Sequence, residues 1–350
     1  MAPVILALRA EPSVDIRLCV TGQHREMLDP VLALFGIAAD HDLDLMAPGQ
    51  SLNALAGRCF TGLDDVLAEV APDRVLVHGD TTTAMAAALA AFHRGIPVAH
   101  VEAGLRSGGL AAPFPEEMNR RAIDLVADLL LAPTPGARRN LEAEGAAGRI
   151  VATGNTAVDA LELALAIEGG EEVSADPQRK LVLVTGHRRE SFGAGFEGIC
   201  AALAELARRG DVEIIYPVHL NPEVRGPVEQ TLGGARNVRL LPPLGYLPLV
   251  RLMQRADLIL TDSGGIQEEA PSLGTPLLVM RDVTERPEAV AAGLARLVGT
   301  DTQRIVAEAN AVLDGAAAFP AGPNPYGDGK ASARIVAALL GREVPEFTGT

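Results

Sequence analysis

The segment that decides the fold lies between residues 256 and 276 and reads A-D-L-I-L-T-D-S-G-G-I-Q-E-E-A-P-S-L-G-T-P. Its apolar start, Ala256 to Leu260, is typical of a buried strand, and two glycines precede a helical pattern with two glutamates in its first turns. A strand that ends in small residues directly before a helix leaves free backbone N–H groups at the positive end of that helix, where anions bind. The sequence therefore predicts a phosphate-binding βα turn.

The polar side chains of this segment suit a nucleotide. Ser263 can add a hydrogen bond, and the two glycines that follow let the backbone approach an anion. Glu268 or Glu269 can accept from ribose hydroxyls, and Arg286, in the following T-E-R-P-E, supplies the positive charge that a pyrophosphate needs. The alternative is an ordinary α/β turn with capping residues. Arg286 and the rest of the chain favour the phosphate site.

The composition is that of a globular protein with room for two domains. The chain has 350 residues, 48% of them hydrophobic, and a mean hydropathy of +0.20. No window approaches the ~18 apolar residues of a membrane span, and the N-terminus lacks a signal-peptide pattern. Cys19, Cys59 and Cys200 show no metal-ligand spacing and suggest a reducing compartment. We expect a soluble cytoplasmic protein.

The charge of the chain excludes some classes of partner. A net charge of −15 argues against a nucleic-acid or anionic-membrane surface. With no Trp and 3% aromatic residues, a stacking platform for single strands is also not expected. A nucleotide ligand stays possible, because helix ends and a few local cations can hold it.

Strand and helix patterns alternate along nearly the whole chain. Strands are expected at 16–20, 74–78, 97–101, 129–132 and 149–152, and then at 181–185, 213–218, 238–241, 257–261 and 276–280. Helices are expected at 24–35, 51–70, 82–94, 116–127, 135–145 and 156–167, and the chain opens on a helical pattern with no strand before it. The alternation predicts an α/β protein with two doubly wound, Rossmann-like domains facing a cleft, with ligands at the carboxyl ends of the strands.

The domain limits follow from a polar segment. Residues 168–179 read E-G-G-E-E-V-S-A-D-P-Q-R and form the expected linker. The N-terminal domain then covers 1–167 and the C-terminal domain covers 180–328, followed by a terminal helical segment, 329–350.

Carboxylates follow neighbouring strands of the first half. Asp80 follows V-H-G, Glu102 follows H-V, and Glu116 starts a helix after P-F-P. Singly, Asp80 reads equally well as a helix cap, and Glu116 as a residue that favours the helix dipole. Three acids at three neighbouring βα positions instead indicate a cluster able to transfer protons.

The second half places cations at its strand ends. His187 and Arg188 follow V-T-G, which fits phosphate contact or general-acid work, with a structural histidine as the alternative. His219, after the next strand, is ambiguous. The acidic segment 40–44 is interpreted as a solvated turn rather than a metal site. The chain has no nicotinamide-binding glycine motif, no Walker loop, no nucleophile elbow and no zinc signature.

Taken together, these segments resemble the non-hydrolysing UDP-N-acetylglucosamine 2-epimerases. The matching segments, which run over nearly the whole chain, are V-T-G-Q-H-R-E-M (20–27), V-H-G-D-T-T-T (77–83), H-V-E-A-G-L-R-S (100–107), P-F-P-E-E-M-N-R (113–120), T-G-N-T (153–156), T-G-H-R-R-E-S-F (185–192), Y-P-V-H-L-N-P (216–222), the S-G-G-I-Q-E-E-A-P-S-L-G and T-E-R-P-E segments, and N-P-Y-G-D-G (324–329). The resemblance implies a GT-B fold, a homodimer, no metal and no cofactor. It also implies that the final helix, about 329–341, crosses back to the first domain.

The implied reaction interconverts UDP-GlcNAc and UDP-ManNAc. UDP leaves C1 as the C2 proton is lost, giving a 2-acetamidoglucal that is re-protonated on the opposite face. By motif position the resemblance assigns proton handling to Asp80, Glu102 and Glu116, and the leaving phosphate to His187. It assigns UDP binding to Arg188, Leu244, Leu249, Ser263, Gly264, Gly265, Glu269 and Arg286, and a possible allosteric UDP-GlcNAc site to Gln23 and His219.

The chain departs from the family in two places. Relatives begin with a strand and a G-T-R-P-E loop whose Arg, with a Lys just before the position of Met1, contacts the substrate phosphates. By this resemblance the first strand of the N-terminal domain is missing. Leu249 stands where relatives often have a Phe against the uracil. The alternatives are a catalytically impaired UDP-sugar-binding relative, a GT-B glycosyltransferase that uses UDP-GlcNAc, and a hydrolysing epimerase.

Overall fold

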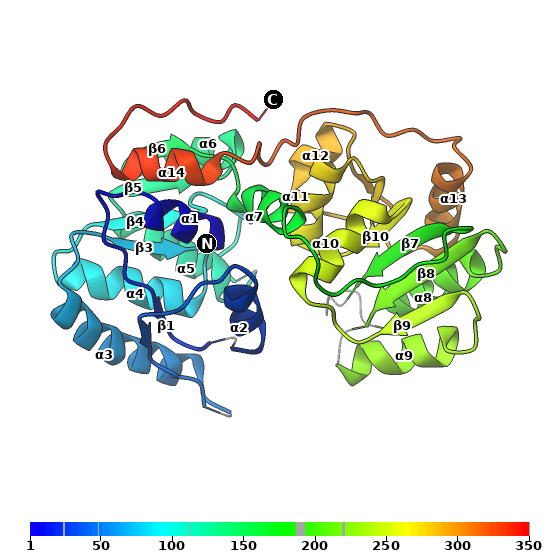
Figure 1. Ribbon diagram of the computed structural model, residues 1–350, viewed down its shortest axis with the longest axis horizontal. Coiled ribbons are helices and arrows are strands. Elements are labelled where there is room, and N and C mark those ends of the chain that lie inside the picture. The colour runs from blue at the N-terminus through cyan, green and yellow to red at the C-terminus, as the bar shows by residue number, and fades with distance from the viewer. Residues whose placement is uncertain (24, 48, 112, 187–192, 219–220, 350) are drawn as a thin grey trace. The chain divides into compact units, whose positions relative to one another are not determined.

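The computed structural model describes residues 1–23, 25–47, 49–111, 113–186, 193–218 and 221–349 (Figure 1). The chain divides into two compact units. Unit 1 comprises Met1–Ala160 with Tyr326–Thr350, and unit 2 comprises Leu161–Pro325. Both are built from parallel strands with intervening helices, so the expected α/β class is confirmed. No helix in these ranges is long and apolar enough to cross a membrane.

Unit 1 contains the following elements. Its strands are β1 (Cys19–Val20), β2 (His41–Asp42), β3 (Val75–His78), β4 (Val98–Val101), β5 (Leu129–Ala132) and β6 (Arg149–Ala152). Its helices are α1 (Ala2–Arg9), α2 (Arg25–Leu34), α3 (Leu52–Val70), α4 (Thr82–His93), α5 (Glu116–Val126), α6 (Pro135–Ala143) and α14 (Ala331–Leu339). Helix α7 (Thr156–Leu165) contains the boundary with unit 2.

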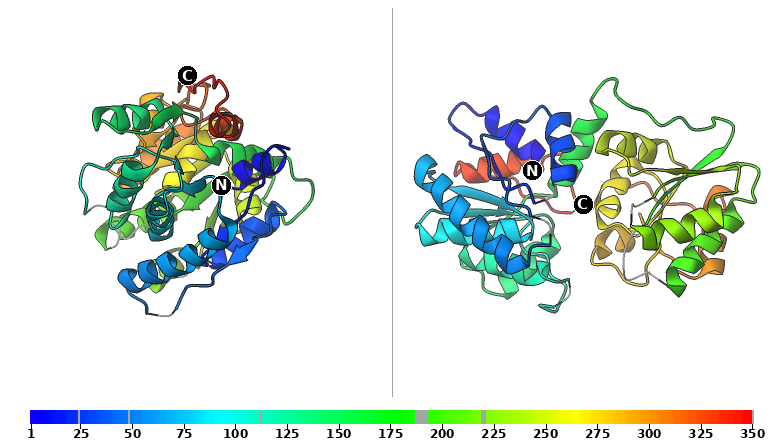
Figure 2. Two further views of the ribbon diagram at one scale, coloured as in Figure 1. Left: turned by 90° about the vertical axis from the view of Figure 1, so that its left-hand side faces the viewer. Right: turned by 90° about the horizontal axis from the view of Figure 1, so that it is seen from below.

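Two helical layers cover the main sheet of unit 1. Leu130 of β5 packs with α3 and α4 on one face, whereas Leu129 and Leu131 pack with α1 and α14 on the other. Successive strand side chains point to opposite faces, which explains why the run L-L-L-A is apolar throughout. Helices α1 and α14 lie side by side, although they come from opposite ends of the chain (Figure 2). Helix α14 thus belongs to unit 1 although it lies near the end of the chain.

The strands of unit 1 form two separate sheets. Strands β3, β4, β5 and β6 pair in sequence order, while β1 and β2 pair only with each other among the described residues. A cavity of ≈ 1160 Å³ is lined by both β1 and β3, including Leu18, Cys19, Val75 and Leu76. The sheet is thus interrupted between β1 and β3, where a doubly wound sheet has a central strand.

Unit 2 contains the remaining elements. Its strands are β7 (Lys180–Thr185), β8 (Val212–Pro217), β9 (Val238–Leu241), β10 (Leu258–Thr261), β11 (Leu277–Val279) and β12 (Arg296–Leu297). Its helices are α8 (Ala194–Leu206), α9 (Pro222–Leu232), α10 (Tyr246–Arg255), α11 (Gly264–Leu273), α12 (Pro287–Ala291) and α13 (Thr302–Leu313).

The strand order of unit 2 fixes where a ligand can bind. The order is β12-β11-β10-β7-β8-β9, with every pair parallel. The chain starts in the middle at β7, proceeds to one edge, and returns to build the other half from β10. Strands β7 and β10 end in register at Thr185 and Thr261. Ligands of doubly wound sheets bind at such a switch point, just beyond the carboxyl ends of these two strands.

All ten expected strands are present, with ends that differ by a few residues, but two short strands were not predicted. β12 and β2 have two residues each, too few for a periodic pattern. The interpretation of residues 40–44 as a solvated turn is wrong, because β2 lies there and pairs with β1. Arg25 donates to the carboxylates of Asp42 and Asp44, at 2.7 and 3.2 Å, which compensates the concentrated negative charge.

Candidate active site

The predicted phosphate turn lies at the switch point of unit 2. β10 ends at Thr261 and α11 begins at Gly264, with Ser263 at the N-cap position. The Ser263 side chain makes no capping hydrogen bond. Since the first N–H groups of a helix have no partner within the helix, this end presents backbone donors and one hydroxyl. The arrangement suits an anion.

Arg286 packs directly against the start of α11. A Cβ atom on Gly264 would lie 2.6 Å from the Arg286 Cζ, so no side chain fits at position 264 while the guanidinium stays in place. Arg286 Nε donates to Glu268 Oε1 at 2.6 Å, and its NH1 donates to Glu285 at 2.8 Å. The cation is therefore fixed beside the helix N-terminus, and glycine at 264 is needed for the close approach.

A second layer of hydrogen bonds joins the two motifs of this turn. Gln267 is fully buried, and its amide nitrogen donates to the carbonyl of Ser263 at 3.1 Å. Thr284 donates to the other end of that amide at 2.7 Å and accepts from the Arg286 backbone N–H at 3.1 Å. Sequence reasoning missed Gln267 and Thr284, although both lie inside the quoted motifs.

Glu269 lies on a different face of α11 from Glu268. Tyr246, the first residue of α10, donates from its hydroxyl to Glu269 Oε1 at 3.0 Å. Burial raises the pKa of Glu269 to about 7, although the tyrosine hydrogen bond opposes this shift. Leu244 precedes α10 and Leu249 lies within it, and both are partly buried. Tyr246 and Glu269 thus join the start of α10 to α11 beside the predicted phosphate turn.

Asp80 in unit 1 is held by an arginine rather than used as a helix cap. The N-cap of α4 is Thr81, whose hydroxyl accepts from Ala84 N at 3.1 Å, so the capping alternative for Asp80 is wrong. Asp80 Oδ2 instead accepts from Arg120 of α5, from NH2 at 2.6 Å and from Nε at 3.1 Å. Asn119 donates to the carbonyl of Asp80 at 2.8 Å.

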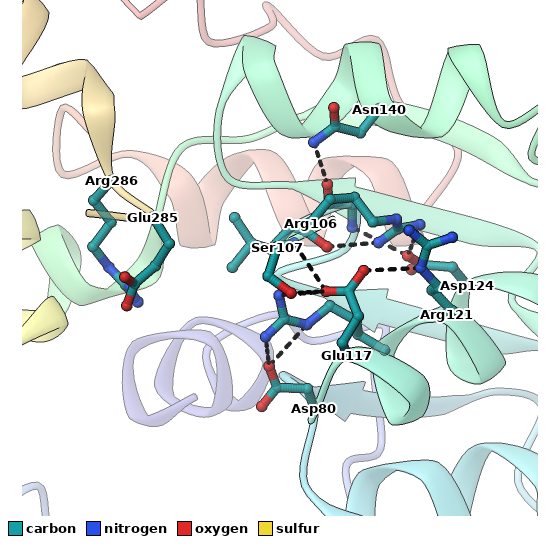
Figure 3. A network of polar contacts seen from close by, with 12 residues as sticks. Asp80, Arg106, Ser107, Glu117, Arg121, Asp124, Asn140, Glu285 and Arg286 are labelled. Atoms are coloured by element: carbon teal, nitrogen blue, oxygen red, sulfur yellow. Dashed lines mark hydrogen bonds and ion pairs between the residues drawn. The ribbon is translucent and has the colours of Figure 1, made fainter. Parts of the chain in front are cut away.

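Glu117, next to the predicted Glu116, is the centre of this network (Figure 3). It is fully buried and accepts from Ser107 N at 3.0 Å, Ser107 Oγ at 2.9 Å and Arg121 Nε at 2.8 Å. Arg120 NH1 also lies 3.3 Å from Glu117 Oε2, which links the Asp80 pair to this carboxylate. Glu116 is half-buried at the first position of α5. Sequence reasoning did not identify Glu117.

A buried histidine supports the loop that carries Asp80. His100 is fully buried, with Nδ1 2.6 Å from Asp124 Oδ1 and Nε2 2.8 Å from the carbonyl of Gly79. Asp124 also receives Arg106 NH2 at 2.8 Å (Figure 3). The His100 contact ties the turn before Asp80 to α5.

Glu102 has a backbone conformation unusual for its residue type. It follows β4 with φ +70°, in the left-handed region that favours glycine. Its Oε2 lies 3.7 Å from His78 Nε2, and a Cβ on Gly79 would come within 3.1 Å of the same oxygen. Because β3 and β4 are neighbours, the structure places Glu102 and the turn that carries Asp80 at adjacent strand ends.

The remaining predicted residues divide into two groups. The Thr83 hydroxyl in the first turn of α4 donates to Gln23 Oε1 at 2.6 Å, so Gln23 lies close to the turn that carries Asp80. His187, Arg188 and His219 lie outside the described residues. Within the described part of the chain, no group of three or more His, Cys, Asp or Glu side chains has the geometry of a metal site.

Comparison with known proteins gives a consistent result. The family model described as UDP-N-acetylglucosamine 2-epimerase matches residues 6–340. UDP-N-acetylglucosamine 2-epimerase of Escherichia coli strain K12 is 54% identical, and the match covers 98% of this chain and 96% of that protein.

The similar solved structures include ones with a bound nucleotide. The structure of UDP-GlcNAc 2-epimerase from Neisseria meningitidis bound to UDP-GlcNAc superposes with a TM-score of 0.88 at 44% identity, covering 98% of this chain and 96% of that one. The Methanocaldococcus jannaschii enzyme in complex with UDP-GlcNAc and UDP gives a TM-score of 0.79 at 32% identity, covering 97% and 95%. These similarities place the present chain in the GT-B fold class.

Proposed function

Since the chain belongs to the UDP-N-acetylglucosamine 2-epimerase family, we propose that it interconverts UDP-GlcNAc and UDP-ManNAc by elimination and re-addition of UDP through a 2-acetamidoglucal. The C2 hydrogen of the sugar is not next to a carbonyl, so its direct removal has no enolate to stabilise the charge. Departure of UDP from C1 lowers this barrier, because the electrons of the C2–H bond form the C1–C2 double bond as the pyrophosphate leaves.

Unit 2 supplies the groups that would hold UDP. The free N–H groups of α11 at Gly264 and Gly265, the Ser263 hydroxyl and the guanidinium of Arg286 would stabilise the charge on the departing pyrophosphate. Glu269 would accept from the ribose hydroxyls, since Glu268 is already bonded to Arg286. Leu244 and Leu249 would contact the uracil.

Unit 1 supplies the carboxylates that would move the proton. Asp80 lies in the turn between β3 and α4, and Glu102 and Glu116 lie at the two ends of the connection from β4 to α5. A carboxylate on each face of C2 would allow removal of the proton from one side and its return from the other. Arg120 fixes the Asp80 side chain. By resemblance, His187 would contact the leaving phosphate together with Arg188.

The packing of Arg286 on Gly264 is the strongest support for this proposal. Glycine at position 264 lets the Arg286 guanidinium pack on the helix end, where a Cβ would lie 2.6 Å from its Cζ, so the helix end and the cation would form one preorganised anion site at the switch point. An enzyme that must stabilise a leaving pyrophosphate needs such a site before the reaction starts.

The proposal also includes two features for which the resemblance is the support. The protein would act as a homodimer, which light scattering can measure. Gln23 and His219 would contribute to a second UDP-GlcNAc site, and the hydrogen bond of Gln23 to α4 places it near Asp80. A sigmoidal dependence of rate on UDP-GlcNAc that is lost in Gln23→Ala would support this second site.

Incubation with UDP-GlcNAc in D₂O tests the reaction. We expect UDP-ManNAc with deuterium at C2, observed by NMR. In Asp80→Asn we expect neither UDP-ManNAc nor deuterium at C2. Free UDP with free ManNAc would indicate hydrolysis instead. Transfer of GlcNAc to an added acceptor would indicate a glycosyltransferase, and binding without deuterium exchange would indicate a UDP-sugar-binding protein.

A further inference from the structure

Two adjacent glutamates of α11 have different partners. Glu268 Oε1 receives Arg286 Nε at 2.6 Å, and the Glu268 carbonyl receives Asn324 Nδ2 at 2.7 Å. Glu269 instead receives the hydroxyl of Tyr246 at 3.0 Å. Consecutive helical residues point about 100° apart, so one side chain can serve the cation while its neighbour faces α10.

We propose that Tyr246 positions the Glu269 carboxylate to accept from the ribose hydroxyls, and so makes the site select ribonucleotides over 2′-deoxyribonucleotides. This inference rests on the proposed function, because it concerns the nucleoside end of the same UDP site. Tyr246 is a positioning residue in this account, since it acts through Glu269.

The geometry of α10 supports a fixed hydroxyl. Tyr246 is the first residue of the helix, and the next two residues, Leu247 and Pro248, are buried and anchor that turn. A phenol group donates one hydrogen bond, which leaves the second carboxylate oxygen of Glu269 to accept from another donor. Among the described residues, Tyr246 is the one hydrogen-bond partner of this carboxylate.

The Tyr246 hydroxyl affects the protonation of Glu269 near neutral pH. Burial raises the pKa of Glu269 to about 7, the hydrogen bond from Tyr246 lowers it, and the nearby Glu268 raises it. The charge of Glu268 is itself paired with Arg286. Loss of the Tyr246 hydroxyl therefore moves the pKa of Glu269 further up. A protonated carboxyl is a weaker acceptor, so recognition of ribose should then fail at a higher pH than in the wild type.

Binding of UDP and of 2′-deoxy-UDP, measured by calorimetry from pH 6 to pH 8.5, tests the inference. At pH 8 we expect the wild type to prefer UDP by about tenfold or more, since a hydrogen bond to a charged group typically contributes that much. In Tyr246→Phe we expect this preference to fall to about threefold or less at pH 7 and to recover partly as the pH rises. For UDP-GlcNAc, KM should rise while kcat changes little.

Two variants serve as controls. Tyr216→Phe also removes one buried hydroxyl in unit 2, whose bond goes to the carbonyl of Gly186 at 2.9 Å, and it should keep the wild-type ratio of UDP to 2′-deoxy-UDP affinity. Glu269→Gln should lower the ratio and remove its pH dependence, because the amide does not titrate.

The outcomes separate the inference from the proposed function. If Tyr246→Phe binds UDP and keeps the wild-type ratio at every pH, the positioning role is wrong while the UDP site stands. If Tyr216→Phe lowers the ratio as much as Tyr246→Phe does, the effect is general loosening of unit 2 and the inference is again wrong. If the wild type binds neither nucleotide, the proposed function itself fails.

Discussion

The proposed acid cluster of unit 1 and the proposed anion site of unit 2 differ in how much of their hydrogen-bonding capacity is already used within the protein. In unit 2 the first N–H groups of α11 have no partner within the helix, and Arg286 lies beside them, bonded to Glu268 and Glu285. In unit 1 two carboxylates are paired with arginines, since Arg120 links Asp80 to the buried Glu117 and Arg121 also bonds to Glu117. A site that only binds an anion can leave its donors open. A site that must hold several carboxylates close together has to neutralise some of them first.

Replacement of Asp80 by Asn should have the largest effect on activity. If Asp80 transfers the proton, kcat should fall by about 10²–10⁴-fold. The affinity for UDP, measured by calorimetry, should stay unchanged, because UDP binding is assigned to unit 2. An equal loss of UDP affinity would show that the two regions do not divide the work as proposed.

Gly264→Ala should damage binding in unit 2 with little effect on unfolding. The new Cβ would stand 2.6 Å from the Arg286 Cζ, so the guanidinium must move away from the helix end. We expect UDP affinity to fall by about 10-fold to 100-fold, the typical value of one charge-assisted contact. Gly226→Ala in α9 is a matched control, because nothing lies within 4 Å of its added Cβ. Similar losses in both variants would contradict the specific role of Gly264.

Glu117→Gln should destabilise unit 1. Removing the charge leaves Arg120 and Arg121 without their buried partner, which typically costs about 3 kcal/mol in the free energy of unfolding. Burial alone would raise the pKa of Glu117, but hydrogen bonds from Arg121 and Ser107 outweigh it and lower the pKa. The stabilisation is therefore present above the unfolded-state pKa and is lost as the pH falls through the lower folded value.

Urea denaturation of wild type and Glu117→Gln at pH 7 and pH 4 measures this contribution. The difference between the two proteins should shrink at the lower pH. A difference that stays constant over this interval would mean that Glu117 is not ionised in the folded protein. Glu116→Gln, at the neighbouring half-buried position, is the control and should change stability by less than about 0.5 kcal/mol.

Glu102→Gly should change stability less than Glu117→Gln does, and it should stabilise unit 1 rather than destabilise it. Residues other than glycine at positive φ typically store about 1 kcal/mol of strain or more, so glycine at this position should raise the free energy of unfolding by about that amount. Activity should nevertheless be lost with the carboxylate. A denaturation midpoint below that of the wild type would show that contacts of the Glu102 side chain outweigh its backbone strain.

The sequence predicted the strand, turn and helix of the proposed anion site because these parts are close together in the chain. The strand, the glycines and the helix lie within residues 256–276, and each has a local signature. The same holds for most strands, since β5 and β7, for example, are continuous apolar runs that are buried in the structure. Two-residue strands such as β2 carry no periodic signal, and only pairing with β1 reveals them.

The network of unit 1 was harder to predict because its contacts are long-range. Glu116 and Glu117 are the same residue type at adjacent positions, so the sequence does not distinguish them. The direction in which each side chain leaves α5 brings Glu117, rather than Glu116, to Ser107 and Arg121. The Asp80–Arg120 pair joins residues 40 positions apart. Tyr246 and Glu269 likewise meet only after α10 and α11 have packed. Such pairs follow from packing, which a single sequence does not display.

Because the sheet of unit 1 is interrupted beside β3, we expect backbone amide hydrogen exchange to differ between the two edges of this strand. Alternate backbone groups of a strand point to opposite sides. Val75 and Gly79 donate to the carbonyls of Pro97 and Val101, so the N–H groups of Leu76 and His78 point away from β4, and Leu76 lines the cavity between β1 and β3. Those two amides should exchange with deuterium much faster than their immediate neighbours in the same strand. β3 thus has one protected edge and one labile edge, and an apolar segment in extended conformation can pair with the labile one.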